Sequence, residues 1–403
     1  MKKITFLSYF IFSIFLVYLT FDNHEKIDTK IKKIKKTYSK DVKKTITANY
    51  FDVIIEKVFD LKSDERTASL FFDDEKKSKD KNLLIFTQDG KQIKGNKVEN
   101  LDLTKNFVTI KNGGLKTVFF IKDIPYGLAT MQLANCFYAA IINLADNSEI
   151  FKTKCFLGTE DILDLNGIGS NYAMMNNKIY LSIGTPEWEI NANSQLAQDK
   201  NSYIGKILEF EERDFPNKII PNIFSYGHRN PQGIVNLENE LFATEHGPRG
   251  GDELNKINNG QNYGWPKVSY GTNYLGFDEG KSLPMNHEQN GFIEPLFAFV
   301  PSVAISDLSE CPNNLKKFYK KQCLMALSLG GNALREGKSL IIFLLNEKKN
   351  TVHSIEKIKL NDSRFRHFAV IKGKKKLYED EEGNFYISAD YDGVYKIKFS
   401  NIR

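Results

Sequence analysis

The sequence is poor in histidine and tryptophan, and each shortage limits the sites or folds that the chain can form. Six histidines are spread over 403 residues, and none lies between His24 and His228. A site built from residues 25–227 therefore has no imidazole. Two tryptophans stand against thirty phenylalanines and eighteen tyrosines. This composition favours half-buried pleated surfaces, where aromatic side chains are enriched.

Cysteine is also scarce. The four cysteines fall into two local pairs, Cys136 with Cys155 and Cys311 with Cys323. In an exported protein each pair could close a short loop as a disulfide. Spacing alone does not decide between disulfides and buried thiols, so both alternatives stay open.

The net positive charge is confined to the N-terminal part of the chain. The formal net charge is +6, but residues 23–44 alone hold nine lysines against Glu25, Asp28 and Asp41. Residues 45–403 are therefore close to neutral. A nucleic-acid partner is excluded, because it would require a basic face on the folded body.

The composition of the first residues indicates a membrane segment. Residues 4–21 are apolar and follow Lys2 and Lys3, a length between a signal-peptide core and a membrane span. We predict an N-terminal anchor at 1–22 and a lysine-rich tether at 23–48, with a cleaved signal as the alternative. The lysines after the span favour the cytoplasmic side, whereas an exported body requires the opposite orientation.

From about residue 49 the chain reads as all-β. Six units place a polar residue before four residues of strand type; they begin at Asn82, Asn135, Lys178, Glu240, Gln322 and Asn384. Turn pairs such as Asn176-Asn177 flank most of them. Six sheet units with variable loops predict a six-bladed β-propeller over 49–403, closed by pairing of its two ends. A β-sandwich is the alternative fold.

One stretch of fifty residues, 225–274, carries the densest motifs. It contains Gly-His-Arg-Asn-Pro-Gln-Gly at 227–233, Glu-His-Gly-Pro-Arg-Gly-Gly-Asp-Glu at 245–253 and Asn-Tyr-Gly-Trp-Pro at 262–266. This stretch resembles the soluble glucose/sorbosone dehydrogenases that depend on pyrroloquinoline quinone (PQQ). The resemblance implies the same propeller and the oxidation of a sugar or similar alcohol.

The resemblance also nominates site residues. For PQQ it implies contacts from Asn112, Arg229, Asn230, Lys338, Arg364 and Arg366, with Arg335 as a rival for Lys338. Arginine suits this role because its guanidinium pairs with carboxylates through two bonds. For Ca²⁺ it implies the carbonyls of Gly247 and Pro248, and a second, structural site at Asp252, Glu253 and Tyr263. Loop capping is the alternative for Asp252 and Glu253.

The general base is where the sequence departs from the family. The position expected to hold a histidine is Gly167, and the aspartate that follows the next strand is Thr185. We name Arg229 and His246 as candidate catalytic residues, with Asp164 and Glu160 as further substitutes for the base.

Two functions follow from these observations. The first is an exported, membrane-anchored quinoprotein dehydrogenase, with the propeller on the periplasmic or extracellular side. The second is a catalytically inactive propeller that binds a ligand or serves as an envelope scaffold. A calcium-dependent lactonase on the same fold is a third. The sequence predicts neither the substrate nor the oligomeric state.

Overall fold

The computed structural model describes residues 43–73, 82–158, 164–186, 192–273, 282–330 and 338–403. Strands make up 48% of the described residues, so the all-β prediction is confirmed. The described helices are short: α2 (Ala192–Gln195), α3 (Asn313–Tyr319) and the 3₁₀ turns η2 (Ile110–Asn112), η3 (Leu165–Gly167), η4 (Glu212–Asp214) and η6 (Glu288–Asn290).

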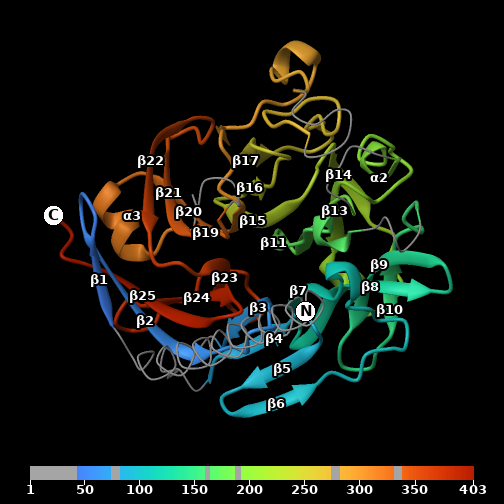
Figure 1. Ribbon diagram of the computed structural model, residues 1–403, viewed down its shortest axis with the longest axis horizontal. Coiled ribbons are helices and arrows are strands. Elements are labelled where there is room, and N and C mark those ends of the chain that lie inside the picture. The colour runs from blue at the N-terminus through green and yellow to red at the C-terminus, as the bar shows by residue number, and fades with distance from the viewer. Residues whose placement is uncertain (1–42, 74–81, 159–163, 187–191, 274–281, 331–337) are drawn as a thin grey trace, which may run out of the picture. The chain divides into compact units, whose positions relative to one another are not determined.

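The described strands form five sheets (Figure 1). Four of them have four strands each. These are β7 (Leu115–Ile121), β8 (Ile124–Leu133), β9 (Cys136–Asn143) and β10 (Glu149–Lys152); β11 (Tyr172–Met175), β12 (Lys178–Ile183), β13 (Lys206–Glu211) and β14 (Asn222–Tyr226); β15 (Pro231–Leu237), β16 (Glu240–Glu245), β17 (Asp252–Ile257) and β18 (Phe297–Phe299); and β19 (Ile305–Glu310), β20 (Gln322–Ser328), β21 (Ser339–Leu345) and β22 (Val352–Lys359).

The fifth sheet has nine strands in the order β1-β2-β25-β24-β23-β3-β4-β5-β6. Its strands are β1 (Lys44–Thr47), β2 (Asp52–Asp60), β25 (Gly393–Ser400), β24 (Phe385–Asp390), β23 (Arg364–Ile371), β3 (Thr67–Phe72), β4 (Leu84–Thr87), β5 (Lys91–Lys94) and β6 (Lys97–Asn100). Antiparallel pairing holds each half together, and a short parallel pairing of β23 with β3 joins the halves.

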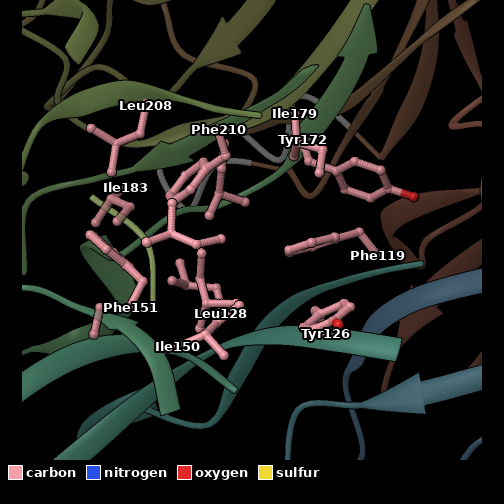
Figure 2. Packing of buried hydrophobic residues seen from close by; sticks show 14 of the residues in the cluster. Phe119, Tyr126, Leu128, Ile150, Phe151, Tyr172, Ile179, Ile183, Leu208 and Phe210 are labelled. Carbon is pink, nitrogen blue, oxygen red and sulfur yellow. The ribbon is translucent and has the colours of Figure 1, made fainter. Parts of the chain in front are cut away.

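Apolar side chains fill the space between successive sheets. Figure 2 shows one such cluster, in which Phe119, Leu128 and Phe151 of the β7–β10 sheet face Tyr172 and Leu208 of the β11–β14 sheet. Comparable clusters join each later sheet to the next. Two-sided packing explains why the central strands are apolar on both faces, and it excludes the alternative of a simple two-sheet sandwich.

The two ends of the propeller-like body are paired, as the sequence predicted. Strand β2 runs antiparallel to β25, with Asp52 opposite Ser400 and Asp60 opposite Gly393. Asp52 also accepts hydrogen bonds from the side chains of Asn401 at 2.7 Å and Arg403 at 3.0 Å. The first and last strands therefore belong to one sheet.

The six repeated units identified in the sequence all contain strands, namely β4, β9, β12, β16, β20 and β24. Five of them are the second strand of a sheet or half-sheet, whereas β9 is the third strand of its own. The spacing is irregular because connections differ in length, the longest described one separating β17 from β18. Asn176 and Asn177 both have positive φ, as a tight turn between β11 and β12 requires.

Both cysteine pairs are disulfides in the structure. Cys136 bonds Cys155 and Cys311 bonds Cys323, with Cα–Cα distances of 5.2 and 5.4 Å. Among the residues that the structure describes, no helix combines the length and the apolar character needed to cross a membrane. The predicted anchor at 1–22 lies outside those residues, as does the tether up to residue 42.

The disulfides should contribute measurably to stability. Each closes a short loop, for which restriction of the unfolded chain gives about 3 kcal/mol. We expect dithiothreitol to lower the urea midpoint of the wild type, and replacement of either pair by serine to lower the free energy of unfolding by about 3 kcal/mol. A variant with all four cysteines replaced is the control, since a reductant should not affect it. A wild-type midpoint that dithiothreitol leaves unchanged would contradict this expectation.

Candidate functional site

Several nominated residues lie just before, or at the beginning of, a strand that starts a sheet or one half of the nine-stranded sheet. They are Asn112 before β7, Gly167 before β11, Arg229 and Asn230 before β15, and Arg364 and Arg366 in β23. Hydrogen bonds between the connecting loops show that these strand beginnings meet. Arg66, directly before β3, donates to Asn112 Oδ1 at 3.4 Å, and Asn112 Nδ2 donates to Asp164 Oδ1 at 3.2 Å.

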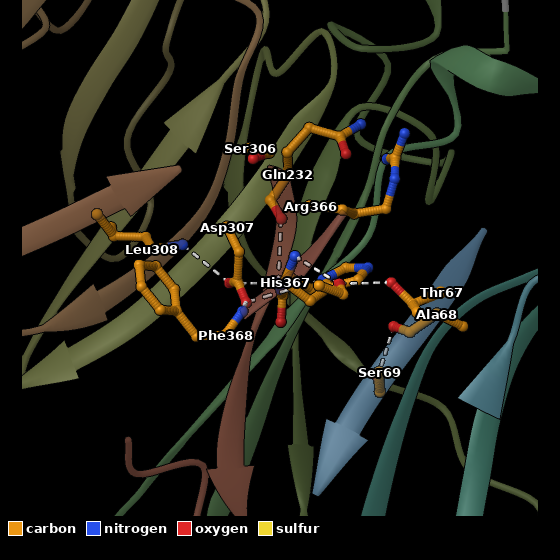
Figure 3. A network of polar contacts seen from close by, with 12 residues as sticks. Thr67, Ala68, Ser69, Gln232, Ser306, Asp307, Leu308, Arg366, His367 and Phe368 are labelled. Atoms are coloured by element: carbon orange, nitrogen blue, oxygen red, sulfur yellow. Dashed lines mark hydrogen bonds and ion pairs between the residues drawn. The ribbon is translucent and has the colours of Figure 1, made fainter. Parts of the chain in front are cut away.

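A buried polar network ties these first strands together beneath the site. Figure 3 shows Asp307 of β19 accepting hydrogen bonds from the backbone N–H groups of Leu308 at 2.8 Å and Phe368 at 3.0 Å. His367 Nδ1 lies 3.7 Å from the same carboxylate, and Asn171 donates to it at 2.8 Å. His367 is thus part of this structural network.

Both the side chain and the backbone of Arg229 are fixed by contacts. Its Nη1 donates to the carbonyls of His246 at 3.1 Å and Gly247 at 2.8 Å, and its guanidinium lies 5.2 Å from the ring centre of Trp265. Its own carbonyl accepts hydrogen bonds from Thr185, from the backbone N–H at 2.7 Å and from Oγ1 at 3.0 Å. Thr185 therefore positions the Arg229 backbone.

The neighbouring His228 has a structural role, as expected from its turn. It is completely buried, and its ring lies between Ser225 Oγ at 2.8 Å and Glu245 Oε2 at 3.0 Å. It also stacks on Tyr263, with ring centres 4.6 Å apart.

His246 adjoins Arg229 and has an unused nitrogen. Its backbone N–H donates to the Asn230 carbonyl at 3.0 Å, while its Nε2 is buried and has no hydrogen-bond partner among the described residues. Burial lowers the pKa of His246, and Arg229 and Arg366 lower it further against the opposing effect of Asp252. The imidazole is therefore neutral at neutral pH.

The space around His246 is small. A cavity of about 10 Å³ is lined by Arg229, His246, Gly247, Trp265 and neighbouring residues, which is room for about one water molecule. A tricyclic quinone or a sugar does not fit in this cavity as it stands.

The two arginines of β23 differ in their partners. Arg366 pairs with Asp390 through Nε at 2.6 Å and Nη2 at 2.5 Å. The guanidinium of Arg364 has no acceptor within hydrogen-bonding distance among the described residues. Burial lowers the pKa of Arg364, and the nearby Arg366 and Arg66 add to the effect.

Two cations in this region were missed by the sequence analysis. The charge of Arg66, directly before β3, acts on Arg364, and Lys116, the second residue of β7, is influenced by both Arg366 and Arg66. Lys116 directly follows the Asn-Gly-Gly-Leu motif at 112–115, so its position was a usable signal. The sequence holds no such signal for Arg66, because only the fold brings this residue to the site.

Gly167 and Gly169 lie in a tight turn at the beginning of the β11–β14 sheet. Asp164 caps this turn by accepting a hydrogen bond from the Asn166 N–H at 2.8 Å. Gly169 must be glycine, since a Cβ there would lie 1.9 Å from Asn230 Oδ1. Asn230 itself accepts from Gln232 Nε2 at 2.7 Å.

The groups nominated for calcium do not fit a calcium site as they are arranged. The Gly247 carbonyl accepts from Arg229, a cation that Ca²⁺ would face directly. The Asp252 carboxylate already accepts four hydrogen bonds, from Gly247 N, Ser302 Oγ, Val303 N and Ile305 N. The Tyr263 hydroxyl bonds the backbone of Lys256 and Asn258. In the described part of the chain, no cluster of three acidic, histidine or cysteine side chains could hold a metal ion.

Three nominated residues border or fall outside the described ranges. Lys338 lies directly before β21, and its carbonyl accepts from Leu360 N at 3.4 Å. Its rival Arg335 and the substitute base Glu160 are outside the described residues.

Comparisons with known proteins agree with this arrangement. A model described as glucose/sorbosone dehydrogenase matches residues 135–391. The chain is 36% identical to the aldose sugar dehydrogenase YliI of Escherichia coli (strain K12) over 190 residues, covering 43% of this chain and 47% of that protein. The matches to curated relatives span less than half of each relative.

Solved structures support the fold over a greater length. The apo form of the soluble aldose sugar dehydrogenase from Escherichia coli superposes with a TM-score of 0.64 at 22% identity, covering 86% of this chain and 99% of that one. The PQQ-bound aldose sugar dehydrogenase from Streptomyces coelicolor gives a TM-score of 0.55 at 17% identity, covering 87% and 100%.

The buried carboxyl of Glu253 should make stability depend on pH. Burial, and then the neighbouring Glu245, raise the pKa of Glu253 to about 8 from an ordinary value of 4.5. The folded state therefore holds a proton that the unfolded chain has lost, so stability falls as the pH rises from about 4.5 to 8. We expect the free energy of unfolding in urea to fall by about 2–5 kcal/mol across this range.

Glu253→Gln should flatten this dependence, whereas Glu288→Gln, at an exposed position, should leave it unchanged. If millimolar calcium at pH 8 stabilises the wild type but not Glu253→Gln, the absence of a calcium site is the wrong interpretation.

Proposed function

Because the chain belongs to the glucose/sorbosone dehydrogenase family, we propose that it binds PQQ and oxidises an aldose or a similar alcohol. Its likeness to an aldose sugar dehydrogenase supports this activity. That match spans less than half of the relative, so the proposed activity rests mainly on the residues of the site.

The observation that carries the proposal is an excess of positive charge at one place. Three arginines gather where β3 and β23 begin: Arg66, Arg364 and Arg366. The opposing charges in the same group are Asp164 and Asp390. Bringing partly buried like charges together is unfavourable unless an anion compensates them, and the three carboxylates of PQQ would do so.

The chain's residues fit such a ligand. Arg364, with no acceptor of its own among the described residues, would pair with one carboxylate, and Asn112 and Arg366 flank it. Arg229 and Asn230 would form the opposite wall. Bound PQQ would supply an ortho-quinone that accepts a hydride. Lys338 stays a further candidate contact at the edge of the site.

Calcium is not part of this proposal, because Arg229 and the backbone occupy the donors that the resemblance assigned to it. The family's histidine position is Gly167, and His246 lies in a cavity too small for a sugar. An inactive, ligand-binding propeller is therefore the second candidate. It predicts PQQ binding without turnover.

We also propose that the body is a six-bladed propeller. Dividing the nine-stranded sheet at the parallel β23–β3 pairing gives six antiparallel units. This count is supported by the apolar cluster of Leu70, Phe72, Tyr378 and Tyr386, which packs one half against the other.

Arg364→Met should separate cofactor binding from folding. A charge-assisted hydrogen bond contributes about 1.5–3 kcal/mol, so we expect PQQ affinity to fall about 10- to 150-fold by isothermal titration. Thermal stability should not fall, because Arg364 gives up no internal bond seen here and repels Arg66 and Arg366. Arg229→Ala should abolish binding altogether. It is a less selective test, because the carbonyls of His246 and Gly247 then lose their hydrogen-bond donor.

Arg403→Met, at a distant exposed arginine, is the matched control. Equal PQQ affinity in both variants would refute the assigned pocket. A wild type that binds no PQQ, or that reduces no dye with any aldose, would refute the dehydrogenase.

We propose that the protein is exported and stays anchored through residues 1–22, with the propeller outside the cytoplasmic membrane. The two disulfides support this, because such bonds persist in oxidising compartments. Protease added to intact spheroplasts of producing cells should degrade residues 49–403 while a cytoplasmic marker survives. Complete protection of both would place the propeller inside.

A further inference from the structure

Lys116 joins two loops at the edge of the proposed site. Its amine donates to the Asn112 carbonyl at 2.7 Å and to the Leu165 carbonyl at 2.8 Å. Leu165 begins the turn η3, which ends at Gly167. The amine is thus anchored to the same turn in which the family resemblance expects an imidazole.

The two hydrogen bonds at this nitrogen suit a neutral amine, and they also suit an ammonium whose third N–H faces solvent, since the side chain is partly exposed. A neutral amine has two N–H groups and one lone pair, whereas an ammonium has three N–H groups. Among the described residues, the two carbonyls are the acceptors within reach. They use both N–H groups of the neutral amine and leave its lone pair free.

Lys206 provides the contrast. It is fully buried, and its nitrogen donates to three carbonyls, those of Leu196 at 2.8 Å, Ala197 at 2.9 Å and Ile204 at 2.7 Å. Three acceptors match an ammonium and leave no lone pair. Burial lowers the pKa of both lysines to about 7, so their bonding patterns, and not their pKa values, distinguish them.

The charges around Lys116 also favour the neutral form. Burial lowers the pKa of its amine most, Arg366 and Arg66 lower it further, and Asp164 is the carboxylate that opposes them. A base whose pKa lies near the working pH is both available and able to hold a proton.

We propose that Lys116 is the catalytic proton acceptor that stands in for the histidine missing at Gly167. This inference rests on the proposed dehydrogenase function. The O–H bond of the substrate alcohol breaks and its proton binds the lone pair of Nζ. Bound PQQ would accept the C–H hydride, which carries both electrons, and the alcohol would become a carbonyl.

The ammonium that forms can keep its bonds to Asn112 and Leu165, and Asp164 lies near to offset the new charge. The two other candidate bases among the described residues are less suited. The Asp164 carboxylate accepts from Asn166 and Asn112, and the free nitrogen of His246 is buried on the Arg229 side.

A first test needs no turnover. The protein without cofactor is labelled with isotope-coded acetic anhydride between pH 5 and 11, and each lysine is followed by mass spectrometry. Lys116 should acquire label with a midpoint near pH 7, with the exposed Lys154 as internal reference for reagent reactivity. A midpoint near 10.4, the ordinary value for lysine, would overturn the assignment.

A second test uses Lys116→Met, which removes the base, and Lys116→Arg, which keeps the positive charge but cannot be deprotonated. Both should lower kcat about 10²- to 10⁴-fold while PQQ affinity stays within a few-fold. Lys154→Met is the control. In Lys116→Ala, added ethylamine should restore part of the rate, more so at higher pH.

The outcomes separate the two proposals. If the wild type turns over and Lys116→Arg turns over equally well, Lys116 is only an electrostatic contact and this inference fails alone. If the wild type binds PQQ but oxidises no aldose, the dehydrogenase proposal and this inference fail together.

Discussion

The pairing of β2 with β25 is the constraint on which the rest of the structure depends. The sheets are apolar on both faces, so each must be covered by a neighbour on either side. An open row would leave two such faces exposed, and the junction of the chain ends removes them. Closure also makes the beginnings of the first strands converge, which is how residues as distant in sequence as Arg66, Lys116 and Arg366 come together.

The same convergence sets the chemistry. Backbone groups at strand beginnings are not all used by the sheets, and here they bind side chains: carbonyls of Gly247 and His246 hold Arg229, and carbonyls of Asn112 and Leu165 hold Lys116. These contacts fix both side chains without neutralising the charge of Arg229. Asp390 is the exception, since it pairs directly with Arg366. The positive charge that remains is available to an anionic ligand.

Local pattern predicted the fold well because turns and alternating strands are encoded by neighbouring residues. The turn at Asn176-Asn177 was predicted for this reason, whereas the spacing of Cys136 and Cys155 left a disulfide and buried thiols as alternatives. Contacts between residues far apart in the sequence could not be predicted in this way. Asp252 looked like a metal ligand next to Glu253, but residues 302–305, fifty positions away, saturate its carboxylate. Arg66 carries no local motif, and the charge that it adds to the site appears only after closure. The predicted roles of Asn230, Lys338 and Pro248 stay predictions.

The two departures from the family can be understood as one change. The resemblance expects a histidine at Gly167 and an aspartate at Thr185. A buried aspartate beside a histidine is useful because it orients the ring and stabilises its charged form. Without the imidazole, a carboxylate at position 185 would be a buried charge without a partner, which is costly. Threonine removes that charge, and its hydroxyl and N–H hold the Arg229 carbonyl instead. In this interpretation the frame that positions Arg229 is intact, and Lys116, on the adjoining sheet, is proposed for the role that the resemblance assigns to the histidine.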